Sequence, residues 1–196
     1  MTQAFFTSEE SVEKELVRLI DHSHSSIDLA LFRFASKPLA LAISRARERH
    51  VRLRLVLDGH SEAEGKDNSL GTAFVHGEVR RLDGKRGGTQ GIMHHKFVLF
   101  DNDRVVTGSF NWTAGAEHVN YENALLTDSS SVVAAYKREF DRLWERAENV
   151  DPGSMESNLP AFKKLTIRAP ATASKHSSKS PKKKKRRRKA KKAKIP

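Results

Sequence analysis

The stretch GIMHHKFVLFDNDRVVTGSFNWT, from Gly91 to Thr113, combines two apolar runs with a dense set of polar residues. Residues 94–100 and 104–110 are expected to form two strands, because each contains an apolar run and the Asp-Asn-Asp between them favours a tight hairpin turn. Polar side chains gather at the outer ends of both runs. They are either strand ends that face water or parts of a functional site.

Alternation along the strands decides which of these polar groups can meet. His94 and Lys96 share one face of their strand, while His95 points to the other, where it packs or forms a bond. Ser109 and Asn111 are also two residues apart and share a face. Because a hairpin brings the two pairs together, an imidazole, an ammonium, a hydroxyl and an amide are predicted to converge at one end of neighbouring strands.

This set of groups suits attack on a phosphodiester. The imidazole of His94 can act as nucleophile or as acid and base, while Lys96 and its two neutral neighbours hold the non-bridging oxygens as negative charge develops. Glu122 is expected to accept a hydrogen bond from the other ring nitrogen of His94 and so fix its tautomer. The chemistry requires no metal and no other cofactor, and the nine histidines show no zinc spacing.

The residues of this stretch resemble the signature of the phospholipase D superfamily, HxKxxxxDxxxxxxGSxN. Every specified position is matched, by His94, Lys96, Asp101, Gly108, Ser109 and Asn111. Glu122 and Asn123 stand where the family commonly has an acid and an asparagine, and the resemblance extends over about residues 5–147. Asp101 has two readings, because it is either support for the active site or an aspartate favoured by the hairpin turn.

The resemblance implies a fold, a mechanism and an assembly. The fold would be a phospholipase D-like α/β domain with a mixed, mostly parallel sheet flanked by helices. In the mechanism, one histidine attacks phosphorus to form a phosphohistidine, and a second histidine protonates the leaving oxygen and later activates water. Since the motif occurs once here, as in the small single-motif bacterial endonucleases of the family, two chains would pair as a homodimer and each would supply one His94.

The rest of residues 1–149 reads as one domain. Helices are expected over 8–23, with a serine N-cap at Ser8 or Ser11, and over 37–50 and 130–147. Strands are expected over 25–36, 51–59 and 121–128, with a shorter one at the start of 77–91. The order strand, helix, strand over 25–59 suggests a parallel βαβ unit. Four basic residues before the site either line a path for phosphates or belong to a solvated basic loop: Arg80, Arg81, Lys85 and Arg86.

The net charge of +12 lies entirely in the C-terminal segment. Residues 171–196 contain 13 of the 36 Lys and Arg residues and no acid, which leaves 23 basic residues against 24 acidic ones in residues 1–170. We expect 150–170 to be a linker and 171–196 a disordered tail that binds polyanions. The nucleic-acid-binding residues within it are Lys182, Lys183, Lys184, Lys185, Arg186, Arg187, Arg188 and Lys189.

The sequence therefore predicts a metal-independent nuclease of DNA or RNA whose tail binds nucleic acid. A phospholipase D-type lipid phosphodiesterase or phosphatidyl transferase is the alternative, because a polybasic tail also binds anionic membranes, although no interfacial apolar helix supports it. A non-catalytic nucleic-acid-binding protein is the third hypothesis. With no secretory signal recognised, the expected location is the cytoplasm, in association with the nucleoid, or the nucleus where the source organism has one.

Overall fold

A computed structural model describes residues 1–60, 78–85 and 91–150 of the chain. The basic tail, the segment 182–189 within it, and all but the first residue of the expected linker lie outside these ranges. Among the described residues, no helix combines the length and the apolar composition needed to cross a bilayer.

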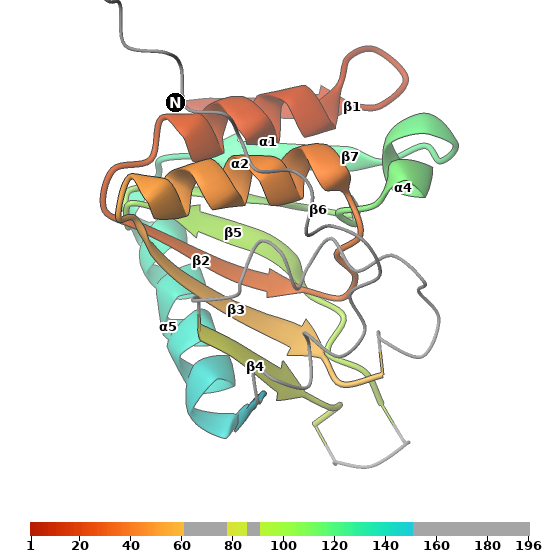
Figure 1. Cartoon of the computed structure of the whole chain (residues 1–196). Coiled ribbons are helices and arrows are strands. Elements are labelled where there is room, and N and C mark those ends of the chain that lie inside the picture. The colour runs from red at the N-terminus through yellow and green to blue at the C-terminus, as the bar shows by residue number, and fades with distance from the viewer. Residues whose placement is uncertain (61–77, 86–90, 151–196) are drawn as a thin grey trace, which may run out of the picture. The chain divides into compact units, whose positions relative to one another are not determined.

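Eight strands of the described residues form a single sheet in the order β1-β7-β6-β5-β2-β3-β4-β8. Figure 1 shows the strands side by side with helices packed against them. In chain order the elements are β1 (Thr2–Phe6), α1 (Val12–Asp21), β2 (Ser26–Leu31), α2 (Lys37–Glu48), β3 (Arg52–Asp58), β4 (Glu78–Leu82), β5 (Lys96–Phe100), β6 (Arg104–Gly108), α4 (Ala114–His118), β7 (Asn123–Thr127), α5 (Ser130–Arg146) and β8 (Glu148–Asn149).

The sheet is mostly antiparallel, so the expectation of a mostly parallel sheet was wrong. Only β3 runs parallel to its neighbours β2 and β4, and the other five pairings are antiparallel. The expected βαβ unit is present as β2, α2 and β3. It does not extend through the sheet, because β5 and β6 are joined by a hairpin and the N-terminal strand β1 pairs with β7 at the far edge.

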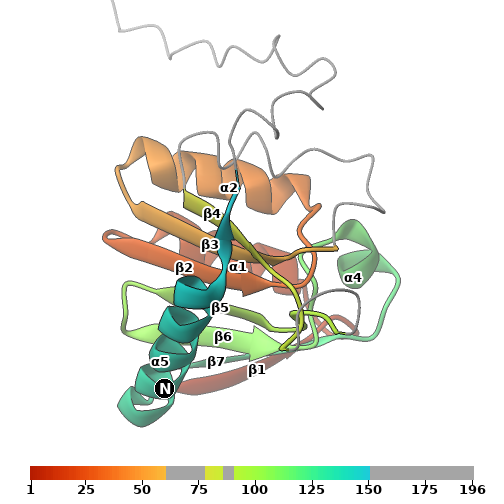
Figure 2. The ribbon, with the colours of Figure 1, turned by 90° about the horizontal axis from the view of Figure 1, so that it is seen from below.

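Helices cover both faces of the sheet. Helices α1 and α2 pack on one face through a large apolar cluster, while α5 packs on the other through a smaller cluster that includes Phe97, Val133 and Phe140. Figures 1 and 2 show α5 on the opposite side of the strands from α1 and α2. Alternate residues of β5 therefore enter different cores, and the central strands are buried on both sides.

Serine caps fix the starts of the two helices on the first face. Ser11 accepts a hydrogen bond from the backbone N–H of Lys14 and caps α1, whose apolar positions are all buried or half-buried. Ser36 caps α2 through the N–H of Leu39, and a proline lies in the first turn. Both helices match the expected ones, with Ser11 as the cap of the first.

Candidate active site

One edge of the sheet collects the polar residues singled out by the sequence. There β5 begins at Lys96, β6 ends at Gly108 and β7 begins at Asn123. The pairs Phe97↔Thr107 and Gly108↔Ala124 place these three strand ends side by side. The structure thus brings the predicted residues His94, Lys96, Ser109 and Glu122 to the same edge.

Ser109 is held by residues at the start of β7. Its hydroxyl donates a hydrogen bond to Glu122 and accepts one from the backbone N–H of Asn123 at 3.1 Å. The other oxygen of Glu122 accepts from the side-chain amide of Asn120 at 3.1 Å. In the single chain the carboxylate of Glu122 is thus bonded to Ser109 and Asn120, in place of the expected bond to His94.

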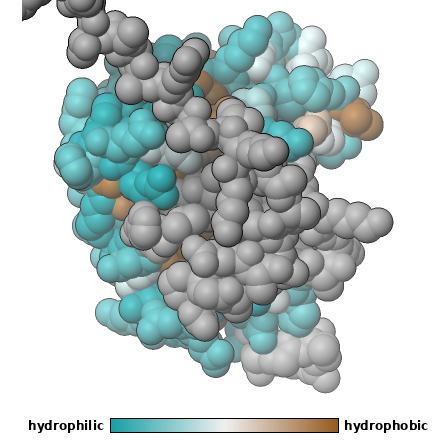
Figure 3. Space-filling view, in the orientation of Figure 1, coloured by the Kyte–Doolittle hydropathy of each residue, from teal (hydrophilic) through white to brown (hydrophobic). Residues whose placement is uncertain are grey.

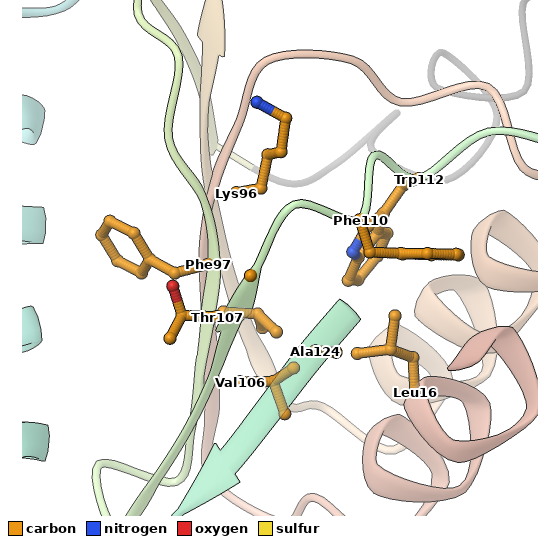
Figure 4. A pocket seen from close by; sticks show the side chains of 10 residues that line it. Leu16, Lys96, Phe97, Val106, Thr107, Phe110, Trp112 and Ala124 are labelled. Atoms are coloured by element: carbon orange, nitrogen blue, oxygen red, sulfur yellow. The ribbon is translucent and has the colours of Figure 1, made fainter. Parts of the chain in front are cut away.

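Lys96 is half-buried at the same edge. Its Nζ donates to the backbone oxygen of His94 at 3.0 Å. Burial lowers the pKa of Lys96, and the negative charge of Glu122 opposes that shift. Figure 4 shows the ammonium above an apolar pocket whose walls include Phe110 and Trp112. The ammonium points away from these rings, and its hydrogen bond to the backbone of His94 keeps it near that residue.

Phe32, which follows β2, connects the nucleophile candidate to the cation. Its ring meets the imidazole of His94 edge-on, with 4.7 Å between the ring centroids, and its centroid lies 5.3 Å from Nζ of Lys96. Sequence reasoning missed this residue, although an aromatic side chain directly after a buried strand was a visible signal. Its contacts orient both functional groups.

The environment of His94 favours the neutral imidazole. Partial desolvation lowers its pKa, the nearby charge of Lys96 lowers it further, and the carboxylate of Asp58 acts in the opposite direction. A neutral imidazole has the free lone pair that a nucleophile or general base needs. His94 is also exposed, so an incoming substrate or a second chain can reach it.

Asp58 is a second residue that sequence reasoning missed. It is fully buried at the end of β3, where one carboxylate oxygen accepts from the N–H of Met93 at 2.7 Å and the other from the N–H of His60 at 3.0 Å. Because Met93 precedes His94, this carboxylate fixes the backbone that presents the imidazole. The sequence signal was the aspartate at the end of an alternating strand, which was interpreted only as a turn.

Asn111 lies beside a rigid aromatic contact. Trp112 is buried and packs against Phe34 with ring centroids 5.0 Å apart, and its backbone N–H donates to the oxygen of Arg33. The side-chain oxygen of Asn111 is buried and finds no hydrogen-bond partner in the described part of the chain. A buried acceptor of this kind is free to bind a donor from a neighbouring side chain or a ligand.

The described residues bring no three His, Asp or Glu side chains together in a way that would hold a metal ion. The residues gathered at this edge instead supply an imidazole, a cation, a hydroxyl and a carboxylate, from His94, Lys96, Ser109 and Glu122.

Residues 16–144 match the family model described as "Cardiolipin synthase, PLD-like domain". The chain belongs to the phospholipase D-like family. The match runs from within α1 to within α5 and includes all of the residues described at the sheet edge.

Curated relatives of this phospholipase D-like chain carry the name mitochondrial cardiolipin hydrolase. The protein from Xenopus tropicalis is 35% identical over 152 residues, which cover 75% of this chain and 66% of that protein. The human protein is 36% identical over 137 residues, which cover 70% of this chain and 52% of that protein. The chain thus spans between half and two thirds of the length of these relatives.

Solved structures show the same fold at low identity. Nuc from Salmonella typhimurium, titled a phospholipase D family member, superposes with a TM-score of 0.67 at 23% identity, covering 76% of this chain and 97% of Nuc. NucT from Helicobacter pylori gives a TM-score of 0.66 at 22% identity, covering 76% of this chain and all of NucT.

The aspartate of the phospholipase D-like signature lies away from the sheet edge described above. Asp101 follows the other end of β5, about 16 Å from Lys96 at the usual rise per strand residue. Asp101 and Asn102 have positive φ, as a type I′ turn requires. The carboxylate accepts hydrogen bonds from the backbone N–H groups of His24, Ser25 and Ser26. Asp101 therefore forms part of the turn and joins it to the start of β2, away from the strand ends that carry Lys96 and Ser109.

The structure also places His95 and Arg80, while Arg86 lies outside the described residues. His95 points to the face of α5, as expected, with its Nε2 3.4 Å from a carboxylate oxygen of Glu139. Arg80 packs its guanidinium 4.2 Å from a ring centroid of Trp144 and donates to that residue's backbone oxygen. Arg80 therefore joins α5 to the sheet and fits neither of the two roles expected for it.

Proposed function

We propose that this phospholipase D-like chain is a metal-independent nuclease that cleaves DNA or RNA through a phosphohistidine intermediate. The observation that carries the proposal is the meeting of His94, Lys96 and Ser109 at one sheet edge, with Asn111 close by in sequence. His94 supplies the nucleophile, and Lys96 and the side-chain amide of Asn111 supply donors to a phosphate oxygen. The hydroxyl of Ser109 would add a third donor once it exchanges Glu122 for that oxygen.

In the proposed reaction, a ring nitrogen of His94 forms a bond to phosphorus while the bond from phosphorus to the leaving oxygen breaks. A second histidine gives its proton to that oxygen. Water then loses a proton to the second histidine and attacks phosphorus, and the bond between nitrogen and phosphorus breaks. Lys96 neutralises the charge that gathers on the non-bridging oxygens in both steps.

The second histidine of this scheme comes from another copy of the chain. The signature occurs once in the sequence, and His94 is exposed at the sheet edge, where a partner can approach it. A twofold dimer would place one His94 from each subunit on opposite sides of the same phosphate. Homodimerisation is thus part of the proposal.

Nucleic acid is the proposed substrate because residues 171–196 contain 13 Lys and Arg residues and no acid. Such a segment binds polyanions without reading sequence. It also supports a location beside the nucleoid, or in a nucleus where one exists. Where residues are described on the face in Figure 3, hydrophilic side chains dominate and the apolar patches are small, which suits a polyanion better than a lipid surface.

A lipid phosphodiester is the second candidate substrate. The observation in its favour is the name of the relatives, mitochondrial cardiolipin hydrolase, at 35% and 36% identity. The same histidine chemistry would cleave a lipid phosphodiester, and a basic tail also binds anionic membranes.

The deciding experiment compares the full chain with His94→Ala in excess EDTA. The substrates are labelled single-stranded and double-stranded DNA and RNA, and liposomes that contain cardiolipin. Cleavage of nucleic acid that disappears in His94→Ala supports the nuclease. Hydrolysis of cardiolipin alone would replace it with the lipid enzyme, and inactivity of a dimeric preparation toward every substrate would contradict both.

A further inference from the structure

Arg33 is a charged residue beside the site to which neither the family signature nor the proposed mechanism gives a role. It follows Phe32, and its guanidinium carbon lies 5.2 Å from the centroid of the Phe32 ring. The same ring contacts the imidazole of His94 and lies 5.3 Å from Nζ of Lys96. One aromatic ring thus groups the nucleophile with two cations.

The position of Arg33 is fixed by the backbone as well as by the ring. Its carbonyl oxygen accepts from the N–H of Trp112 at 3.2 Å, and Trp112 is buried next to Asn111 in sequence. The residue after Arg33, Phe34, packs on the indole. The backbone of Arg33 is therefore hydrogen-bonded to the segment that follows β6, and its guanidinium packs on the Phe32 ring beside His94.

The distances set how far apart the two cations lie. Nζ of Lys96 and the guanidinium carbon of Arg33 are each little more than 5 Å from one centroid, so their separation is at most 10.5 Å. Successive phosphates of one strand advance about 3.4 Å along a duplex axis, so two neighbouring phosphates can lie within that limit. Lys96 serves the phosphate that reacts with His94, which leaves Arg33 placed for the next one.

We propose that Arg33 binds the phosphate adjacent to the scissile phosphate in a polynucleotide strand. The inference rests on the proposed nuclease function and extends it to a second phosphate subsite. A guanidinium suits this role because it presents paired N–H donors to phosphate oxygens while its flat face packs on an aromatic ring. Productive substrates then need at least two consecutive phosphodiesters.

The test compares two thymidine oligonucleotides without terminal phosphates. The dinucleotide contains one phosphodiester, while the trinucleotide contains a second beside the one that is cleaved. The full chain, Arg33→Ala and Arg33→Gln are assayed for kcat/KM on both. Arg142→Ala is the matched control, since this arginine is 70% exposed on α5, across the sheet from α1 and α2.

For the native chain, kcat/KM should be higher for the trinucleotide than for the dinucleotide. In both Arg33 variants, kcat/KM for the trinucleotide divided by kcat/KM for the dinucleotide should fall about tenfold. The change should lie mainly in KM for the trinucleotide, because neither variant can form the charge-assisted hydrogen bonds to the second phosphate. The salt dependence on a longer single strand should also weaken by about 0.7 in the slope of log(kcat/KM) against log[salt]. The Arg142→Ala ratio should equal that of the native chain.

Two outcomes would overturn the role of Arg33 alone. The first is an unchanged ratio in folded Arg33→Ala and Arg33→Gln, whether or not both substrates are cleaved more slowly. The second is loss confined to cardiolipin liposomes, which would assign Arg33 to a lipid substrate. Failure of the native chain to cleave either oligonucleotide or any longer nucleic acid would instead remove the proposed nuclease function, and the subsite with it.

Discussion

Asp101 is a signature residue whose described contacts stabilise the fold, at the opposite end of β5 from Lys96. Burial alone would raise the pKa of its carboxyl, but hydrogen bonds from Ser25, Ser26 and His24 outweigh that effect and hold the pKa below its usual value. These bonds join the β5–β6 turn to the start of β2. The carboxylate therefore stabilises the sheet at the end opposite the candidate catalytic groups.

Replacing Asp101 should consequently lower stability and leave catalysis intact. Because the folded pKa is depressed, the stabilisation is fully present above about pH 4 and is lost as the pH falls through the folded pKa. In urea unfolding at pH 7, Asp101→Asn should lose about 1–3 kcal/mol, the cost of weakening hydrogen bonds to a charged group. The difference from the native chain should shrink below pH 4.

The neighbouring turn residue provides the control for this prediction. Asp103 is 64% exposed and pairs only with Arg104 among the described residues, so Asp103→Asn should change stability little. Activity per folded molecule should match the native value in both variants. A folded Asp101→Asn that lost most of its kcat would restore Asp101 to the active site.

Asp58 acts on His94 both through the backbone and through its charge. In Asp58→Asn, the loss of negative charge should lower the pKa of His94 below its value in the native chain. One of the two backbone N–H groups now bound to Asp58 would also lose its acceptor, at a cost of about 1–3 kcal/mol in stability. NMR titration of the imidazole measures the pKa, and urea unfolding measures the stability.

The control for Asp58 is Asp83→Asn. Asp83 is 42% exposed, and its carboxylate lies 3.7 Å from the ring of His60. Its replacement should leave the titration of His94 unchanged. If Asp58→Asn also titrated like the native chain, the influence of Asp58 would be limited to holding the backbone of Met93.

The sequence revealed the residues of the signature but not Phe32 and Asp58, which support them. Alternation within two adjacent strands was enough to place His94 and Lys96 near Ser109, because a hairpin is a local structure. Phe32 and Asp58 reach the site from β2 and β3, more than 30 residues earlier in the chain. Their contacts depend on which strands are neighbours in the sheet, and periodicity does not contain that information.

At the scale of elements, the close approach of β6 and β7 positions Ser109. A Cβ added to Gly108 would lie 2.2 Å from the backbone oxygen of Asn123, far inside normal contact. Gly108→Ala should therefore push the two strand ends apart, cost about 1–3 kcal/mol or more in unfolding free energy, and move Ser109 away from Glu122. We expect kcat to fall by more than the loss of folded protein explains.

Gly115→Ala is the matched glycine substitution. Gly115 lies in α4, and an added Cβ there meets nothing within 4 Å. The variant should be as active as the native chain and slightly more stable, since alanine favours the helix. Thermal unfolding and steady-state kinetics of both variants measure these effects, and full activity in Gly108→Ala would show that the separation of these strands is not critical.

The same scale shows why strand existence was easier to predict than strand direction. Each apolar run from β2 to β7 was recognised from alternation and turn residues, and α5 matched its expected helix. The direction of pairing depends on the connections between strands. The mostly parallel sheet was predicted from a single βαβ unit. In the structure, β5 runs antiparallel to β2, and β1, which the sequence analysis did not recognise, pairs antiparallel with β7.

At the scale of the whole molecule, the proposed shared site would make activity depend on which chains pair. If each dimer needs two copies of His94, a native chain paired with His94→Ala is inactive. Unfolding and refolding an equimolar mixture should then give about one quarter of the activity of the same total amount of native chain, because only one dimer in four is fully native. A value of about one half would show that each chain acts alone.

The proposed role of the basic tail leads to a separate prediction about the whole molecule. In that role the tail would alter where the enzyme binds and would leave the chemistry to residues 1–149. Deleting residues 171–196, or replacing the basic residues of 182–189 with glutamine, should raise KM for long DNA and flatten its salt dependence. Each phosphate that the tail no longer neutralises lowers the magnitude of the slope of log affinity against log[salt] by about 0.9 for duplex DNA.

Hydrolysis of bis(p-nitrophenyl) phosphate should continue at the native rate, since that substrate offers one phosphodiester and no polyanion. A parallel loss on both substrates would mean that the tail supports the catalytic domain itself, and nucleic acid would then lose its main support as the substrate.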